Sequence, residues 1–292
     1  MAIKDYNPFA KREEFTSSNL LGYKVLTILT WLLVVVSGAY YSVRAPDDCK
    51  ARHHCHTIWG QNKARPTPFA LNSVVTDVYW IITIVLQGHY LRYLWSSDTS
   101  YLNSAANVGS HFILNNLFIF AFIMLWVRGH FWPAEIILIA NFFNLASLYF
   151  RHPKTPLFVH IPIVSAPYAW NYIAILWDGA AMVNARSLPA RILANLAIWG
   201  ILVIGAFFLL VFKDYSMGFE LAILSLALAL GQLGTHVIAF QWIFAFVIFG
   251  CLILLSFLIA VPGLFGEKGV RQDGAVVSED RERAPLLDEA RA

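Results

Sequence analysis

Long apolar runs alternate with short polar breaks along most of the chain. The runs lie at about residues 21–43, 70–95, 108–128, 131–150, 163–183, 189–212, 217–233 and 239–261. Each is close to the ~20 apolar residues that a helix needs to cross the hydrocarbon core of a bilayer. The last two form one stretch, which is too long for a single crossing and is divided near Gly231–Gln241. The pattern predicts an all-α fold, a polytopic transmembrane helix bundle of about eight spans with no soluble domain.

Polar segments flank this predicted bundle of residues 21–262. Residues 1–20 form a polar N-terminal segment, and residues 263–292 form a tail of mixed charge that we expect to be disordered. The composition agrees with a membrane protein, because 58% of the residues are hydrophobic and only 13% are charged, against about 25% charged in soluble domains. The net charge of +3 lies mostly in termini and loops. We therefore expect the lipid bilayer as a partner, and no nucleic acid.

The basic residues indicate an orientation. Eight spans place both termini on one side of the membrane, with 13 Lys and Arg residues on that side and 8 on the other. The positive-inside rule then predicts cytosolic termini. In the tail, Glu282, Leu286 and Leu287 match the acidic dileucine pattern that cytosolic sorting adaptors bind. The pattern is short enough to arise by chance, but it favours an endomembrane, vacuole or endosome, over the plasma membrane.

One acidic residue, Asp178, lies inside the span at residues 163–183. An ionisable group in hydrocarbon costs ~2.5–3.5 kcal/mol on insertion scales, so it is a functional-site hypothesis by default. Asp178 is roughly two turns from the end of its helix, where Arg186 and Arg191 follow. These two arginines are the expected ion-pair partners, either at the mouth of a pocket or as a lock between the fifth and sixth spans.

Polar residues on three spans form the rest of the expected site. Asn171 precedes Asp178 by seven residues and shares its side of the helix, whereas Asn141 and Asn144 form a stripe with Ser147. The third span adds His111 and Asn115, which lie four residues apart on one face. If these groups converge, they predict a ligand-binding or ion-coupling site. The alternative is that they only join helices, since such hydrogen bonds are worth ~0.6–2 kcal/mol each in membranes.

Three other acids lie near the starts of their spans. Asp77 is within two turns of a loop, so we expect it to reach the headgroup layer without a functional role. Glu135 lies near the start of the fourth span, and Glu220 opens the seventh, where a helix N-terminus favours an acid.

The interior loop at residues 44–69 carries two of the three cysteines. A disulfide between Cys49 and Cys55 is expected if the loop faces an oxidising lumen, and two free thiols are the alternative. The cluster His53–His56 has metal-ligand residue types, but it lacks the paired spacing of structural zinc sites. We therefore predict no metal site.

Catalytic motifs are absent from the sequence. It contains no HExxH and no GxSxG, and no pair of aspartates within the spans. A dyad of His111 and Asp178 would require the third and fifth spans to touch. We therefore assign no catalytic residue and no cofactor, and the sequence favours a protein that is not an enzyme.

Several motifs together resemble a fungal family of multipass membrane proteins of unknown function. The matching segments are WGQN at residues 59–62, PTPF at 66–69, SHFILNN at 110–116, NFFNLASLYFRH at 141–152 and WDGAAMVNARSLPARILAN at 177–195. The resemblance covers about residues 7–265. It implies a multipass membrane protein of fungal origin and no particular activity.

The middle of the chain is also similar to tryptophan-rich sensory proteins of the translocator-protein (TspO) class. The matching residues are Pro66 and Phe69, Val78–Trp80, Phe112–Asn116, Leu125–Trp126 and Asn141–Phe150. The resemblance implies a compact bundle with an aromatic-lined pocket for an apolar ligand such as a porphyrin or sterol. Eight spans exceed the basic five of that class, and the tryptophan pattern around Pro133 is only partial.

Two functions follow from these observations. The first is a small-molecule or ion transporter, or a TspO-like binder of an apolar molecule, with a polar interior around Asp178. The alternative is a structural or accessory membrane protein whose polar residues only join helices.

Overall fold

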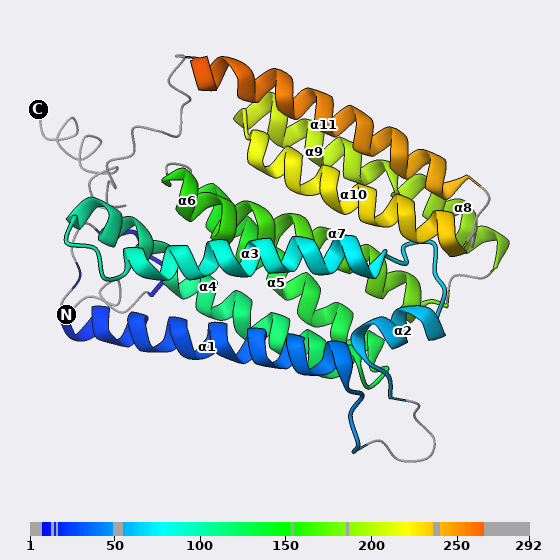
Figure 1. Ribbon diagram of the computed structural model, residues 1–292, viewed down its shortest axis with the longest axis horizontal. Coiled ribbons are helices and arrows are strands. Elements are labelled where there is room, and N and C mark those ends of the chain that lie inside the picture. The colour runs from blue at the N-terminus through cyan, green and yellow to red at the C-terminus, as the bar shows by residue number, and fades with distance from the viewer. Residues whose placement is uncertain are drawn as a thin grey trace, which may run out of the picture.

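The computed structural model describes residues 8–12, 15, 17–48, 55–152, 155–184, 187–235 and 240–265, and in these ranges every regular element is a helix. The long helices run roughly side by side in one bundle (Figure 1). The predicted all-α helix bundle is confirmed.

The first half of the chain supplies four long helices and one short one. They are α1 (Ser17–Val43), α2 (Ile58–Ala64), α3 (Ser73–Tyr93), α4 (Thr99–Trp126) and α5 (Phe131–Arg151). Helix α4 begins nine residues before the expected start at residue 108, because the Asp98 side chain accepts a hydrogen bond from the Ser100 backbone N–H and caps an earlier turn.

The second half begins with a helix that changes its hydrogen-bond pattern. Helix α6 (Leu157–His160) continues through the π segment η2 (Ile161–Ser165) into α7 (Ala166–Met182). Pro167 has no N–H, and the Ala166 N–H bonds to Ile161, so the Pro162 carbonyl receives no backbone bond from either. The Gln87 Nε2 of α3 donates to that carbonyl at 3.2 Å. A buried side chain therefore stabilises the local π geometry.

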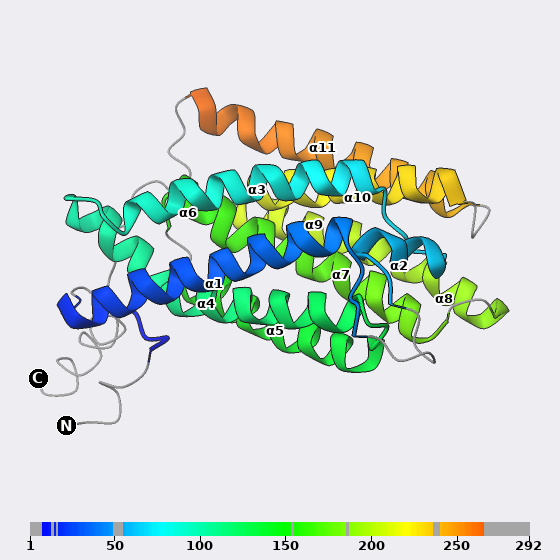
Figure 2. The same ribbon diagram turned by 60° about the horizontal axis from the view of Figure 1, so that its bottom comes forward.

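Four further helices complete the described chain, namely α8 (Leu188–Ala197), α9 (Trp199–Phe212), α10 (Tyr215–Thr235) and α11 (Gln241–Phe265). Figure 1 shows α9, α10 and α11 as a group on one side of the bundle, with α1, α4 and α5 on the other. Helix α7 lies between them and packs on α5 and on α10. The turned view in Figure 2 shows the same arrangement.

Seven helical segments in the described ranges are long and apolar enough to cross a membrane. They are Asn19–Val43, Ser73–Tyr93, Thr99–Trp126, Phe131–Arg151, Leu188–Phe212, Tyr215–Thr235 and Gln241–Val261. The remaining expected span, residues 163–183, corresponds to α7, whose 17 residues are mostly buried in the bundle. Large apolar side chains on the outside, such as Val36, Phe143 and Leu258, are 64–70% exposed, as lipid-facing positions require.

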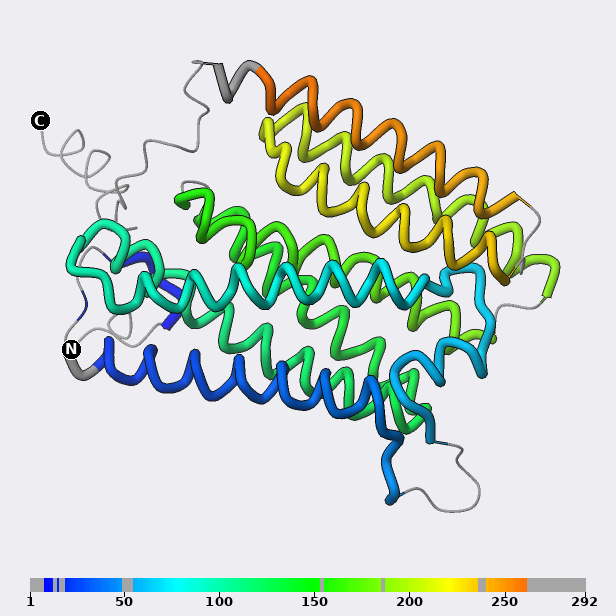
Figure 3. The backbone as a smooth tube through the Cα atoms, in the orientation of Figure 1, coloured from blue at the N-terminus to red at the C-terminus, as the bar shows by residue number. Residues whose placement is uncertain are grey.

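The two ends of the bundle differ. The first turn of α1 and the last turn of α11 lie at the same end (Figure 3), as expected for an even number of crossings. Helix α2 lies at the opposite end. Cys55, which is disulfide-bonded, precedes α2, and Cys251 is free. Cys49, the expected partner of Cys55, lies outside the described residues.

The loop before α3 is held closely against α10. A Cβ atom on Gly231 would lie 2.4 Å from the Ala70 carbonyl oxygen, so only glycine allows this approach. The next residue, Gln232, donates from Nε2 to the carbonyls of Thr67 and Ala70. This anchor fixes the entry of the chain into α3.

Candidate functional site

Five of the six polar residues expected at the site meet in one hydrogen-bonded chain across α4, α5 and α7. At its centre, Asn141 Nδ2 lies 2.9 Å from both Asn115 Oδ1 and Asn171 Oδ1. All three side chains are at most 1% exposed. The convergence that the sequence left open for these asparagines is therefore present.

The ends of this amide chain are bonded as well. Asn144 Nδ2 donates to the His111 backbone carbonyl, and Asn144 Oδ1 lies 2.8 Å from His111 Nδ1. Asn171 Nδ2 donates to the Leu138 carbonyl at 3.0 Å. Of the side-chain nitrogen and oxygen atoms in this amide chain, only Asn115 Nδ2 and His111 Nε2 have no hydrogen-bond partner among the described residues. Mutual hydrogen bonding on this scale is typical of a joint between helices.

The N-terminal segment covers the His111 end. The Phe9 ring lies 4.8 Å from the His111 ring, and Asn107 exchanges two hydrogen bonds with the backbone of Arg12. His152, just after α5, is also buried here. Burial, followed by the nearby charges of His111, Lys11 and Arg151, lowers the pKa of His152 to about 3, so its imidazole is neutral.

Asp178, the sixth expected residue, lies apart from the amide chain and faces Glu135 of α5. Asp178 is 0% exposed and Glu135 is 9% exposed. Glu135 is the one charged group that acts on Asp178 among the described residues. The predicted ion pair with Arg191 is absent, because Arg191 lies at an exposed position of α8 and neither carboxyl oxygen of Asp178 is hydrogen-bonded. Arg186 lies outside the described residues.

The packing of the helices explains why Asp178 faces Glu135 and not Arg191. Helices α5 and α7 pack against each other, so a residue near the start of α5 faces one near the end of α7. Gly179 brings them close, because a Cβ atom there would lie 3.4 Å from Glu135 Oε1. The position of each acid near the end of its span was visible in the sequence, but the pairing of these helices was not.

A cavity of about 370 Å³ lies between α1, α3, α4 and α7. Its wall contains five tryptophans, which are Trp59, Trp80, Trp126, Trp170 and Trp177. Their rings touch in series, with centroids 4.1 Å apart for Trp126 and Trp177 and 5.3 Å apart for Trp80 and Trp170. Ligand pockets in proteins typically have volumes of ~300–1,000 Å³ and mostly apolar walls. The dimensions and lining therefore suit a small apolar molecule.

One acidic residue, Asp77, lines the cavity. Asp77 Oδ1 accepts a hydrogen bond from Trp59 Nε1 at 3.0 Å, whereas Oδ2 has no hydrogen bond within the described structure. The Asp77 side chain is half-buried. The sequence predicts a headgroup-facing residue without a role at Asp77, whereas the structure places Asp77 in the cavity lining.

The cavity reaches the outer surface at α1 and α3. Ala39 of α1 and Ile81 of α3 both line it and are both exposed on the outer surface. Nearer the other end of these helices, Trp31 Nε1 donates to Gln87 Oε1 and holds α1 to α3. Ala39 and Ile81 are apolar, so the cavity reaches the surface on an apolar face of the bundle.

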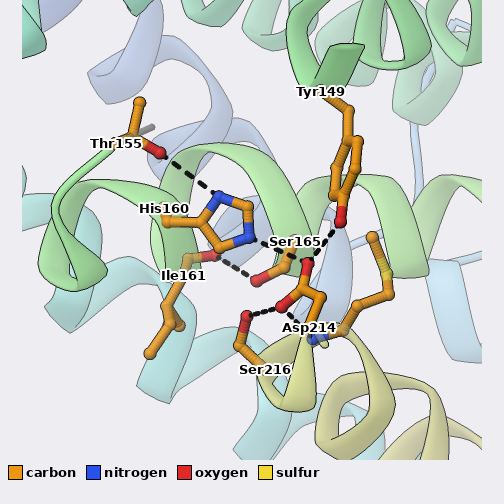
Figure 4. A network of polar contacts seen from close by, with 8 residues as sticks. Tyr149, Thr155, His160, Ile161, Ser165, Asp214 and Ser216 are labelled. Carbon is orange, nitrogen blue, oxygen red and sulfur yellow. Dashed lines mark hydrogen bonds and ion pairs between the residues drawn. The ribbon is translucent and has the colours of Figure 1, made fainter. Parts of the chain in front are cut away.

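A second buried acid, Asp214, forms the polar network in Figure 4. Its Oδ2 accepts from Tyr149 Oη at 2.8 Å and lies 3.0 Å from His160 Nε2. Its Oδ1 accepts from the Ser216 hydroxyl and from the Met217 N–H. Four donors therefore surround one carboxylate.

Sequence reasoning missed this cluster, whose outer member is Thr155, 3.3 Å from His160 Nδ1. The available indication was local, since an Asp just before an apolar run is a typical N-cap, and Asp214 caps α10 in this way. Asp214, His160 and Tyr149 are at most 3% exposed. The cluster joins α5, α6 and α10.

Metal binding has no support in the described ranges, where no group of three His, Cys, Asp or Glu side chains is placed to hold an ion. The described ranges leave out His53 and His54 of the loop cluster and the tail residues Glu282, Leu286 and Leu287.

Fold and surface together define a multipass membrane helix bundle. Residues 191–287 match a family model described as a fungal protein of unknown function (DUF1774). The match supports the resemblance to a fungal family of unknown function, and it runs from α8 into the tail, beyond most of the motifs quoted above. No curated protein and no solved structure matches the chain. The TspO resemblance is therefore not shown.

Proposed function

We propose that the protein crosses the membrane eight times and binds an apolar small molecule that enters from the bilayer. One observation carries this proposal, the cavity that is walled by five tryptophans and reaches the outer surface at α1 and α3. Aromatic side chains provide large, rigid apolar contact surfaces, so a ligand of matching shape gains binding free energy from their desolvation.

The single acid in the lining narrows the class of ligand. Asp77 Oδ2 can accept one hydrogen bond from a ligand hydroxyl, while Trp59 holds Oδ1. The ligand is thus a rigid, mostly apolar molecule with one hydroxyl group, which is the chemistry of a sterol. A charge-assisted hydrogen bond of this kind contributes ~1.5–3 kcal/mol.

Energy transfer to dehydroergosterol, a fluorescent sterol that accepts excitation from tryptophan, tests the proposal. The full-length protein in phosphatidylcholine nanodiscs should show saturable transfer. Ala39→Phe fills the cavity where it reaches the surface and should abolish this transfer, whereas Val36→Phe, on the lipid face of the same helix, should not. Asp77→Asn should weaken binding about tenfold. Non-saturable transfer, or equal transfer in both phenylalanine variants, would contradict sterol binding.

A transporter coupled through Asp178 is the second candidate function. The observation in its favour is an acid buried in the bundle with neither oxygen hydrogen-bonded. Asp178→Asn should then abolish pH-dependent flux in proteoliposomes while membrane abundance stays near wild type. Loss of abundance would instead favour a structural role, which the mutually bonded amide chain also supports.

We also propose that both termini are cytosolic and that the protein resides in an endomembrane. The disulfide-bonded Cys55 supports this orientation, since it lies at the end of the bundle opposite α1's first turn, where an oxidising lumen would be. Changing Leu286 and Leu287 to Ala should redistribute a fluorescent fusion to the plasma membrane. An unchanged location would rule out the dileucine pattern as the sorting determinant.

A further inference from the structure

Glu135 and Asp178 form a pair of acids in the interior, and the proposed sterol site uses neither of them. Asp178 is fully buried, and Glu135 is more than nine-tenths buried. They belong to antiparallel helices that pack together, and each is the electrostatic neighbour of the other. Two carboxylates that face each other away from water repel each other strongly.

Their oxygen atoms lack the partners that buried polar atoms normally have. Apart from the carboxyl group that each faces, Asp178 Oδ1 and Oδ2 and Glu135 Oε2 have no hydrogen-bond partner among the described residues. More than about 90% of buried polar groups in proteins are bonded, so an orphaned one requires an explanation. Two ionised carboxylates offer only acceptors and cannot bond to each other. A proton on one of them would supply the missing donor.

Among the described residues, no cation compensates the pair. The other ionisable groups on α5, α7 and the elements packed against them are Lys63 and Arg65 of the α2 region, Tyr101, His111 and Arg128 of the α4 region, His130, Tyr149 and Arg151 of the α5 region, Tyr168, Tyr172, Tyr215 and Glu220. Neither carboxyl group interacts with any of these residues.

We propose that Glu135 and Asp178 form a proton-binding site in which the two carboxyl groups share one proton at neutral pH. Taking up this proton from water turns two carboxylates into one carboxylic acid and one carboxylate. The new O–H bond of the acid donates to the carboxylate, which replaces repulsion with a charge-assisted hydrogen bond. The site carries one negative charge instead of two.

The proton site is separate from the amide chain but adjacent to the cavity. On α5, Leu138 lies between Glu135 and Asn141, and its carbonyl is already bonded to Asn171. On α7, the preceding residue Trp177 lines the cavity. The proposal does not depend on what occupies that cavity.

Infrared spectroscopy of the full-length protein at pH 7, in nanodiscs of an ether-linked phosphatidylcholine that has no ester carbonyl, tests the proposal. A protonated carboxyl group has a C=O stretching band that a carboxylate lacks. Glu135→Gln and Asp178→Asn each replace the acid by an amide of equal shape, which donates to the remaining carboxylate. Each variant should lose the intensity of one protonated carboxyl group, and the double variant should lose no more.

This non-additive loss is specific to a shared proton. Additive losses would show two independent protonated acids, and a loss in only one variant would show an unshared proton; either result overturns the proposal. Size-exclusion chromatography checks that the variants are folded. The wild type gives a test of its own, because the band should be present in choline chloride and unchanged in sodium chloride. Absence of the band, or its removal by sodium, also overturns the proposal.

Discussion

Asp214 and Asp178 are equally buried, at 3% and 0% exposure, yet their surroundings are opposite. Asp214 accepts from Tyr149, Ser216 and the Met217 N–H, and lies 3.0 Å from His160 Nε2. Asp178 has no hydrogen-bond donor among the described residues and faces another acid. Burial alone therefore does not assign a role to an acidic residue, whereas the hydrogen-bond donors around it do.

The local backbone explains the contrast. Asp214 lies between α9 and α10, where the first N–H groups of a helix are free and can donate to a carboxylate. Asp178 lies within α7, whose N–H groups are already used in the helix. An acid inside a helix depends on neighbouring helices for donors, and α5 brings a carboxyl group instead. Asp214 thus holds helices together, whereas Asp178 has the properties of a proton-binding residue.

The largest expected effect is from breaking the Asp214 cluster. Asp214→Ala leaves Tyr149, His160 and Ser216 without their acceptor, and removing one partner from such a buried cluster costs roughly 3–5 kcal/mol. Thermal unfolding in detergent, followed by circular dichroism, should show a large loss of stability. Phe143→Leu, on the lipid face of α5, is the control and should unfold near the wild-type temperature.

A fall in pH should destabilise the protein through His152, a third buried ionisable group. Its folded-state pKa of about 3 lies below the usual value near 6.5, so the unfolded chain binds a proton that the folded protein does not. The stability it contributes is present above pH ~6.5 and is lost as the pH falls towards 3, on the order of 3 kcal/mol by pH 4. His152→Gln should flatten the unfolding profile between pH 4 and 7. An equally steep profile in this variant would place the acid sensitivity elsewhere.

A smaller effect is expected from the amide chain. Asn141→Leu removes the donor to Asn115 and Asn171, and such bonds between membrane helices are worth ~0.6–2 kcal/mol. The variant should unfold at a modestly lower temperature and retain sterol binding, since Asn141 does not line the cavity. Loss of binding in a stable variant would assign the chain a ligand-contact role after all.

Sequence alone was sufficient for the helices and for part of the site. Apolar runs predicted every long helix. The polar residues of the spans gave Asn141, Asn144, His111, Asn115 and Asn171 as candidates, and the packing of α4, α5 and α7 decides that they meet. Charge proximity along the chain favoured Arg186 and Arg191 as partners of Asp178, whereas helix packing presents Glu135; Arg186 lies outside the described residues. The tryptophan cavity depends on how α1 and α3 separate, and no periodicity within one helix contains that information.

The most direct measurement compares two isosteric variants at pH 7, Asp178→Asn and Asp214→Asn. A carboxyl group that already shares a proton loses little when it becomes an amide, so Asp178→Asn should unfold within about 0.5 kcal/mol of wild type. Asp214→Asn should lose about 2 kcal/mol, because an ionised acceptor of several donors becomes neutral. Equal losses in the two variants, or a larger loss for Asp178→Asn, would contradict this account of the two acids.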